Sequence, residues 1–191
     1  DGDWSSDVCS SDLNEKLYWV IDAYTVSNAY PFSEPIGDIN YMRNSVKVII
    51  DAVNGTTNFY IIDKNDPIIS TYSKIFPGLF KNESEIKEGF KEHFKYPQDY
   101  FAIQCKAMER YHVKNSGTFF SGQNVWDVAK TQKDIDGKKS VNEASYLVMR
   151  LPGEKNEEMI LLQYFNQYQR ENMIALFGAR MDNNLETHQE P

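Results

Sequence analysis

Residues 40–80 read NYMRNSVKVIIDAVNGTTNFYIIDKNDPIISTYSKIFPGLF, and this stretch decides the fold class. Two runs rich in β-branched and aromatic residues, 46–53 and 56–63, lie on either side of Asn54-Gly55. That pair of residues is the one most typical of a tight β-hairpin turn. The stretch therefore predicts two antiparallel strands joined by a two-residue loop.

A two-residue loop also fixes which side chains face each other across the hairpin. It places Ile50 opposite Phe59 and Val48 opposite Ile61, which makes one face apolar. The other face carries Asp51, and we expect it to be half wet. The pattern therefore predicts that the hairpin packs on a core through one face.

A helix start comes after the hairpin at Asp66-Pro67. The carboxylate of Asp66 can accept from free amides of the first turn, and Pro67 has no amide that would need a partner. Pro77-Gly78 ends the apolar pattern. We expect a helix from Pro67 to about Phe76.

The rest of the chain alternates between strand-like and helix-like patterns. Strands are expected over 17–25, 146–151 and 159–165, and helices over 84–94, 97–112, 125–130 and 169–181. Because strands and helices are partly segregated, the predicted class is α+β, with a mainly antiparallel sheet of about five strands and helices packed on one face. We expect a single domain over 14–182 and a disordered tail over 183–191.

Composition excludes several classes of function. The 191 residues carry a formal net charge of −8 and show no basic stripe, so nucleic acid is not an expected partner. No run approaches the roughly 18 consecutive apolar residues of a membrane span. Phosphate-binding and dinucleotide-binding glycine motifs do not occur, and we expect no cofactor.

The first thirteen residues, DGDWSSDVCSSDL, differ in character from the rest of the chain. The triplet Ser-Ser-Asp occurs twice in them, and DVCSSDL resembles the translation of a sequencing adapter. We interpret residues 1–13 as an artefactual, disordered leader, with a flexible polar terminus as the alternative. The natural sequence is then expected to continue upstream of Asn14.

Several short motifs, in their order and spacing, resemble a family of large bacterial membrane proteins catalogued as uncharacterised protein family 0182. The motifs are Tyr30-Pro31-Phe32-Ser33, Arg43-Asn44-Ser45-Val46-Lys47, Asp66-Pro67-Ile68-Ile69, Ile75-Phe76-Pro77-Gly78-Leu79-Phe80, Leu151-Pro152-Gly153-Glu154 and Ala179-Arg180-Met181-Asp182. The resemblance covers about Leu17 to Asp182. It implies a multi-pass transmembrane bundle elsewhere in the longer protein and an extracytoplasmic location for this segment, and it brings no known activity.

Two carboxylates sit in similar apolar settings, Asp22 in VIDAY and Asp51 in IIDAV. If their strands are neighbours, the pair can share a proton or divide acid and base roles, with His112 as a third member of a catalytic site. The alternative is that both point to the wetter face of the sheet. A helix-end role is the alternative for His112.

The polar face of the hairpin supplies the candidates for ligand binding, Arg43, Asn44 and Lys47. Aromatic residues near the first strand, such as Tyr24 and Phe32, are candidates for lining a groove for sugars or peptides. Core and loop packing is the alternative for these aromatic rings.

Residues 132–143, QKDIDGKKSVNE, partly match a calcium-binding loop, with Asp134, Asp136 and Glu143 as candidate metal ligands. Gln132 stands where the first aspartate is usual, and two neighbouring lysines would repel a cation. A solvated Asp-Gly turn explains the same residues.

The leading interpretation is a non-catalytic, extracytoplasmic segment of a bacterial integral membrane protein, with a binding or scaffold role at the cell envelope. Its expected partners are the rest of its own protein and an envelope ligand. An envelope enzyme using Asp22, Asp51 and His112 is the first alternative, and a calcium-stabilised module is the second.

Overall fold

The computed structural model describes the backbone of residues 8–13, and the backbone and side chains of residues 16–130 and 140–181. These residues divide into two compact units, 8–100 and 101–181, where the sequence led us to expect one domain. The tail predicted to be disordered, 183–191, lies outside the described residues.

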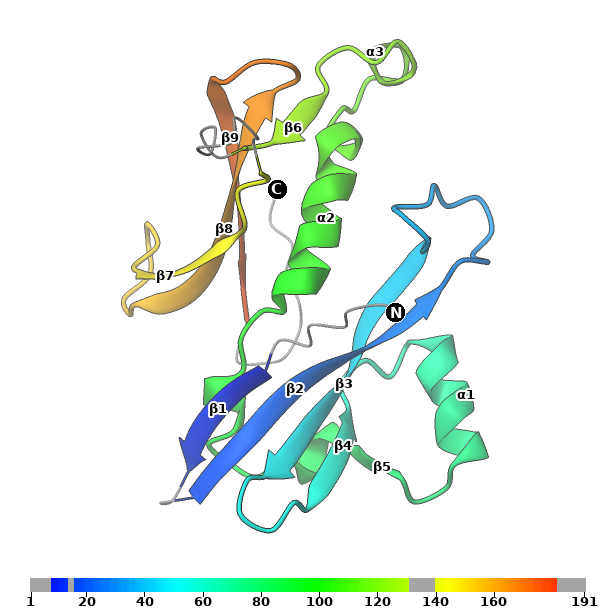
Figure 1. Cartoon of the computed structure of the whole chain (residues 1–191), viewed down its shortest axis with the longest axis vertical. Coiled ribbons are helices and arrows are strands. Elements are labelled where there is room, and N and C mark those ends of the chain that lie inside the picture. The colour runs from blue at the N-terminus through cyan, green and yellow to red at the C-terminus, as the bar shows by residue number, and fades with distance from the viewer. Residues whose placement is uncertain (1–7, 14–15, 131–139, 182–191) are drawn as a thin grey trace. The chain divides into compact units, whose positions relative to one another are not determined.

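The first unit contains a five-stranded sheet with the strands in sequence order (Figure 1). The strands are β1 (Val8–Leu13), β2 (Lys16–Ser27), β3 (Tyr41–Asp51), β4 (Thr57–Ile61) and β5 (Phe80–Asn82). The first four pair antiparallel, and β5 pairs parallel to β4. Residues 1–13 are expected to be disordered, but Val8–Leu13 forms a strand that pairs with β2. The interpretation of residues 1–13 as an artefactual leader stays a prediction.

The hairpin between β3 and β4 forms, but its register is shifted by two residues from the predicted one. Val48 lies opposite Phe59, and Ile50 lies opposite Thr57. The loop is longer than two residues because Asp51 closes it: its backbone amide donates to Thr56 O, and its carboxylate accepts from the Val53 and Asn54 amides. A shift of two leaves every side chain on its predicted face.

The apolar face of this hairpin packs on a core, as predicted, and the core includes α1 (Pro67–Ile75). Ile69 of the helix is buried in one cluster with Val46 and Val48 of β3. Asp66 caps the helix by accepting from the Ile68 amide, and Pro67 occupies the first turn. The predicted helix start is therefore confirmed residue by residue.

The second face of the sheet is covered, whereas the sequence predicted a half-wet surface. Phe90 packs edge-on against Tyr18, with ring centroids 4.9 Å apart, and Tyr100 stacks on Tyr24 at 6.4 Å. Ile49, at the centre of this face, is 3% exposed. The sheet of the first unit is therefore covered on both faces, and the expectation of helices on one face alone is not confirmed.

The segment that covers this face was expected to be one helix over 84–94. It forms two short 3-10 helices, η1 (Glu83–Glu85) and η2 (Lys91–His93). Gly89 lies between them with φ of +92°, a left-handed conformation that a continuous α-helix does not contain. The glycine explains why the predicted helix is interrupted.

The second unit has an antiparallel sheet in which β8 pairs with three other strands. Its elements are α3 (Ser116–Phe120), β6 (Trp126–Val128), β7 (Ser145–Met149), β8 (Glu158–Gln167) and β9 (Met173–Arg180). The helix α2 (Gln98–Tyr111) enters this unit at Phe101, whose ring stacks on Phe177 of β9 at 5.3 Å. The class α+β is confirmed, with two sheets in place of the single sheet expected.

Two predicted helices of this unit are strands. Residues 125–130 contain β6, and 169–181 contain β9. The apolar run Met173–Phe177 suits either structure by its pattern, and pairing with β8 decides for the strand because β8 supplies its hydrogen-bond partners. Among the described residues, no helix combines the length and the apolarity that a membrane crossing requires.

Candidate functional site

A β-bulge shapes the polar interior of the first unit. Ala23 of β2 pairs with Val46, but the next residue, Tyr24, pairs with Asn44, so the register passes over Ser45. The carbonyl of Ser45 accepts from the Ile62 amide at 2.9 Å. The extra residue re-aims a side chain, which is a common role of bulges.

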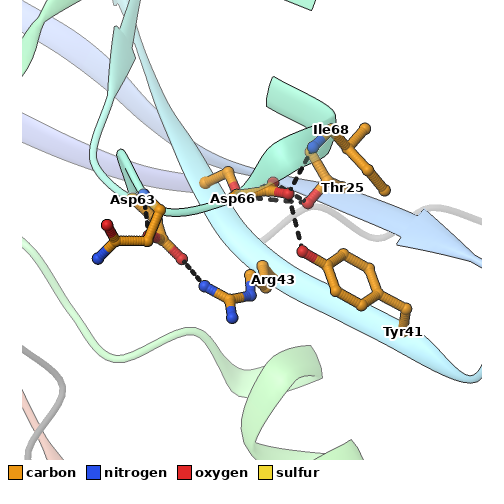
Figure 2. Close-up of polar contacts among 8 residues, drawn as sticks. Thr25, Tyr41, Arg43, Asp63, Asp66 and Ile68 are labelled. Atoms are coloured by element: carbon orange, nitrogen blue, oxygen red, sulfur yellow. Dashed lines mark hydrogen bonds and ion pairs between the residues drawn. The ribbon is translucent and has the colours of Figure 1, made fainter. Parts of the chain in front are cut away.

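The bulge brings Ser45 to the carboxylate of Asp66, which collects hydrogen bonds from side chains of β2 and β3 and from its own helix (Figure 2). The hydroxyls of Ser45 and Thr25 each donate to Oδ2 at 2.5 Å. Tyr41 donates to Oδ1 at 2.8 Å, and the Ile68 amide donates to the same oxygen at 2.9 Å. Asp66 is fully buried, and this hydrogen-bonded group ties β2 and β3 to the start of α1.

The two ionisable members of this group shift in opposite directions. Burial alone would raise the pKa of Asp66, but the hydrogen bonds from Ser45, Thr25 and Tyr41 outweigh it and hold that pKa below its usual value. Burial, with the carboxylate of Asp66 beside it, raises the pKa of Tyr41 to about 12. Asp66 is therefore kept as an acceptor and Tyr41 as a donor.

Arg43, a candidate for ligand binding, contacts the edge of this group. Its Nη1 lies 2.7 Å from Oδ2 of Asp63, and this hydrogen bond raises the pKa of the guanidinium. The guanidinium also lies 5.8 Å from the ring centroid of Tyr41. Arg43 is partly exposed, so a ligand in solvent could reach it.

A second buried polar group contains three further candidates, Asp22, Asn44 and Lys47. Lys47 is 1% exposed and forms an ion pair with Oδ1 of Asp22, which lies directly opposite it on β2. Asn44 donates to the same oxygen at 2.8 Å. The ammonium of Lys47 also lies 5.0 Å from the ring centroid of Phe94. Paired in this way, the two charges compensate each other inside the unit.

Asp51 does not join this pair. It lies opposite Tyr18, four residues along β3 from Lys47, and its carboxylate closes the exposed hairpin loop. Hydrogen bonds from the Val53 and Asn54 amides lower the pKa of Asp51. The convergence of Asp22 and Asp51 that the catalytic hypothesis needs is not present in the sheet.

His112, the third catalytic candidate, belongs to the second unit. Its Nδ1 lies 2.6 Å from the carbonyl oxygen of Met108 and its Nε2 lies 2.9 Å from that of Asn124. Its ring stacks on Trp126 with centroids 3.5 Å apart. These contacts join the end of α2 to the segment before β6, which agrees with a helix-end role for His112.

Of the three candidate calcium ligands, one lies among the described residues. Asp134 and Asp136 lie outside the described residues, and Glu143 is exposed. Within 8–13, 16–130 and 140–181, no three acidic, histidine or cysteine side chains gather as a metal would require. Cys105 is buried in α2, and this burial raises the pKa of its thiol to about 12, so the thiol is held protonated.

The aromatic candidates separate into packed and exposed rings. Tyr24 packs inside the first unit, and Tyr30 stacks on Tyr41 at 5.3 Å. Phe32 is fully exposed and has φ of +59°, a left-handed conformation that is rare for a phenylalanine. The rings therefore do not share one described surface.

Sequence reasoning identifies Asp66 as a helix cap but misses that it organises a buried group. It does not select Thr25, Ser45 or Tyr41 either. Their meeting depends on the bulge at Ser45, for which the local sequence gives no signal. The nearest signal is the presence of the hydroxyl residues Thr25 and Ser45 within the two strands.

Comparison with known proteins gives a family and no activity. The model of the Uncharacterised protein family (UPF0182) matches residues 5–188. A UPF0182 protein of Clostridium novyi (strain NT) is 98% identical over 170 residues, which is 89% of this chain. UPF0182 proteins of Clostridium acetobutylicum and Clostridium botulinum (strain Langeland) are 57% and 56% identical over 169 residues, 88% of this chain.

These relatives are much longer than the chain, which spans 19% of the length of each. No solved structure matches it. The match over residues 5–188 nevertheless covers nearly the whole sequence. The chain belongs to the Uncharacterised protein family UPF0182.

Proposed function

We propose that this chain is a non-catalytic scaffold segment of a longer bacterial membrane protein, placed on the extracytoplasmic side of the cell membrane. The observation that carries the proposal is the mutual pairing of Asp22 and Lys47. Both are candidate site residues, and each compensates the charge of the other in the interior of the first unit. Loss of either partner would leave a buried charge uncompensated, so the fold depends on the pair, and two buried, paired charges are poorly placed to reach a substrate.

The other polar candidates are used in the same manner. Asp66 accepts four hydrogen bonds inside the first unit, Asp51 closes a hairpin loop, and both ring nitrogens of His112 face backbone carbonyls. Such contacts hold elements of a unit together. They support a segment whose role is to present surfaces to the rest of its protein and to an envelope ligand, for which Arg43 is the accessible candidate.

The location is tested by thiol labelling of the full-length Clostridium novyi relative in intact cells. Val53 is 85% exposed in the hairpin loop, so a Val53→Cys variant provides a reactive position in this segment. We expect a membrane-impermeant maleimide to label the variant in intact cells as completely as in lysed cells. Labelling that requires lysis would contradict the extracytoplasmic location.

The scaffold role is tested separately with an Asp22→Asn/Asp51→Asn variant of the full-length protein. The scaffold role predicts that any effect on cells follows the amount of folded protein, because these residues act in folding. An enzyme would lose more of its cellular effect than the fall in folded protein explains. Circular dichroism and the quantity of protein in the membrane fraction distinguish the two results.

A further inference from the structure

A compact loop in the second unit leads from the end of α2 to the segment before β6. It covers residues 110–124, contains α3 and is here called the α3 loop; Figure 1 shows it beyond the C-terminal end of α2. Its two ends lie close together, since Nε2 of His112 is 2.9 Å from the carbonyl oxygen of Asn124. Compact loops of this length with adjacent ends are frequently functional.

Hydrogen bonds within the α3 loop fix its shape. The side chain of Asn115 caps α3 by accepting from the Thr118 amide at 2.9 Å. The Ser121 amide donates to Gly117 O at 3.0 Å, and the Gln123 amide donates to Thr118 O at 3.2 Å. A loop that is already ordered loses little conformational entropy when it binds a partner.

The rings of this loop form one connected aromatic cluster. Phe119 lies at its centre, with its ring centroid 5.5 Å from that of Tyr111 and 5.7 Å from that of Phe120. Phe120 is 84% exposed and Tyr111 is 56% exposed, so much of the cluster faces solvent. Adjacent exposed apolar side chains that are bordered by polar ones mark sites of interaction.

The α3 loop is also basic, although the chain as a whole is acidic. Residues 110–124 include Arg110 and Lys114 and contain no aspartate or glutamate, whereas the whole chain has a formal net charge of −8. Both cationic side chains are exposed, and the guanidinium of Arg110 lies 5.1 Å from the ring centroid of Phe119. The exposed rings and the cations therefore belong to one loop.

The carboxylates next to the α3 loop do not reverse its charge. Glu109 pairs with Lys106 at 2.7 Å, and Asp127 accepts from the Gln169 amide at 3.2 Å. The adjoining turn over 168–172 carries one arginine and one glutamate, whose charges are opposite. Together with these residues, the loop keeps a positive charge.

We propose that the α3 loop docks on the anionic surface of a lipid membrane. Tyr111 and Phe120 enter the boundary between headgroups and acyl chains, which is where aromatic side chains gather. Arg110 and Lys114 face the lipid phosphates, to which basic side chains are attracted. The proposal rests on the membrane location proposed above and names a surface through which the segment contacts that membrane.

A protein surface is the less suitable occupant of the α3 loop. A standard protein interface uses about 20–30 residues on each side, and this loop has 15 residues, of which three form the aromatic cluster. Docking on a membrane depends on apolar insertion and charge, both of which a small loop supplies. Attachment of the same polypeptide to the membrane makes even a weak contact effective, because the tether raises the local concentration.

The test measures how the 191-residue chain sediments with phosphatidylcholine vesicles that contain or lack phosphatidylglycerol. Phe120→Ser removes the exposed ring, and Val53→Ser is its control, since Val53 is 85% exposed in the hairpin loop of the first unit. Lys114→Glu reverses a charge of the α3 loop, and Lys74→Glu makes the same change of net charge at an exposed position of α1. Circular dichroism and urea midpoints verify that each variant is folded.

We expect the chain to bind the vesicles that contain phosphatidylglycerol, and Phe120→Ser and Lys114→Glu each to weaken this binding by about fivefold or more. Val53→Ser and Lys74→Glu should change it by less than about twofold, because neither residue lies in the α3 loop. Absence of binding to the anionic vesicles would overturn the proposal, and so would equal binding to the neutral ones or equal losses in the loop and control variants.

Failure of this proposal is distinguishable from failure of the proposed location and scaffold role. The location is measured by labelling of Val53→Cys in cells, and the scaffold role by the amount of folded protein and the cellular effect of the Asp22→Asn/Asp51→Asn variant. Neither measurement involves the α3 loop. A chain that does not bind vesicles would therefore leave both earlier proposals intact.

Discussion

The hydroxyl of Tyr41 donates to Oδ1 of Asp66 across 2.8 Å, and this contact joins β3 to the first turn of α1. The same carboxylate receives the hydroxyls of Ser45 and Thr25 and the amide of Ile68. Four donors on one buried carboxylate make Asp66 the point at which the helix is attached to the sheet.

Asp66→Ala should therefore lower the free energy of unfolding by about 3 kcal/mol or more, because it leaves several buried donors without an acceptor and removes the helix cap. Asp63→Ala is the matched control, since Asp63 pairs with Arg43 at a partly exposed position and should cost below about 1 kcal/mol. Urea denaturation measures both values. Equal losses for the two variants would show that Asp66 has no special role.

The lowered pKa of Asp66 makes stability depend on pH on the acid side. The ordinary value is 3.8 and the folded value is lower, so the contribution is complete above 3.8 and is lost as the pH falls through the folded pKa. Asp66→Asn should weaken this acid-side loss. Urea midpoints measured from pH 6 down to about pH 2 test the sign, and identical pH profiles for the two proteins would contradict it.

Tyr41 provides the corresponding test in alkali. Its pKa is raised from 10.0 to about 12, so its contribution to stability is complete below pH 10 and is lost as the pH rises through the folded pKa. Ultraviolet difference absorbance should show that Tyr41 ionises well after the exposed tyrosines, and Tyr60, whose pKa burial also raises, should ionise late as well. Tyr41→Phe should reduce the absorbance change at high pH by the contribution of one tyrosine, and a change of unaltered size in the variant would contradict the assignment to Tyr41.

Phe32 offers a test of backbone strain, since it is fully exposed with φ of +59°. Phe32→Gly and Phe32→Ala both remove the side chain, but only glycine adopts this conformation without steric cost. We expect the glycine variant to be more stable than the alanine variant by about 0.5–1 kcal/mol, after the larger entropy loss of glycine. Thermal unfolding of the two variants measures the difference, and a more stable alanine variant would contradict the strain.

The elements that the sequence predicts best are those whose signals are local. Asp66-Pro67 carries its own cap and start signal, so α1 is found almost to the residue. The hairpin is found for the same reason, but the side chain of Asp51 lengthens its loop and shifts its register by two.

The errors come from contacts between distant residues. The segment 169–181 fits a helical period, and only pairing with β8 makes Met173–Arg180 a strand. From the sequence we expect the charged face of β3 to be exposed to water, because each charged residue is considered without its partner on another strand. Asp22 and Lys47 lie 25 residues apart in sequence but directly opposite in the sheet, so no local pattern reveals their pairing.

The central claim is that the side chains resembling an active site serve the fold, and the most direct test is a double-mutant cycle on Asp22 and Lys47. Lys47→Met leaves a buried carboxylate without its cation, and Asp22→Asn leaves a buried ammonium without its anion, so each should cost about 3–5 kcal/mol in urea denaturation. The double variant Asp22→Asn/Lys47→Met buries no charge at these positions and keeps an acceptor for Asn44. We predict that it is more stable than either single variant, whereas losses that simply add, or single variants as stable as the wild type, would contradict the claim.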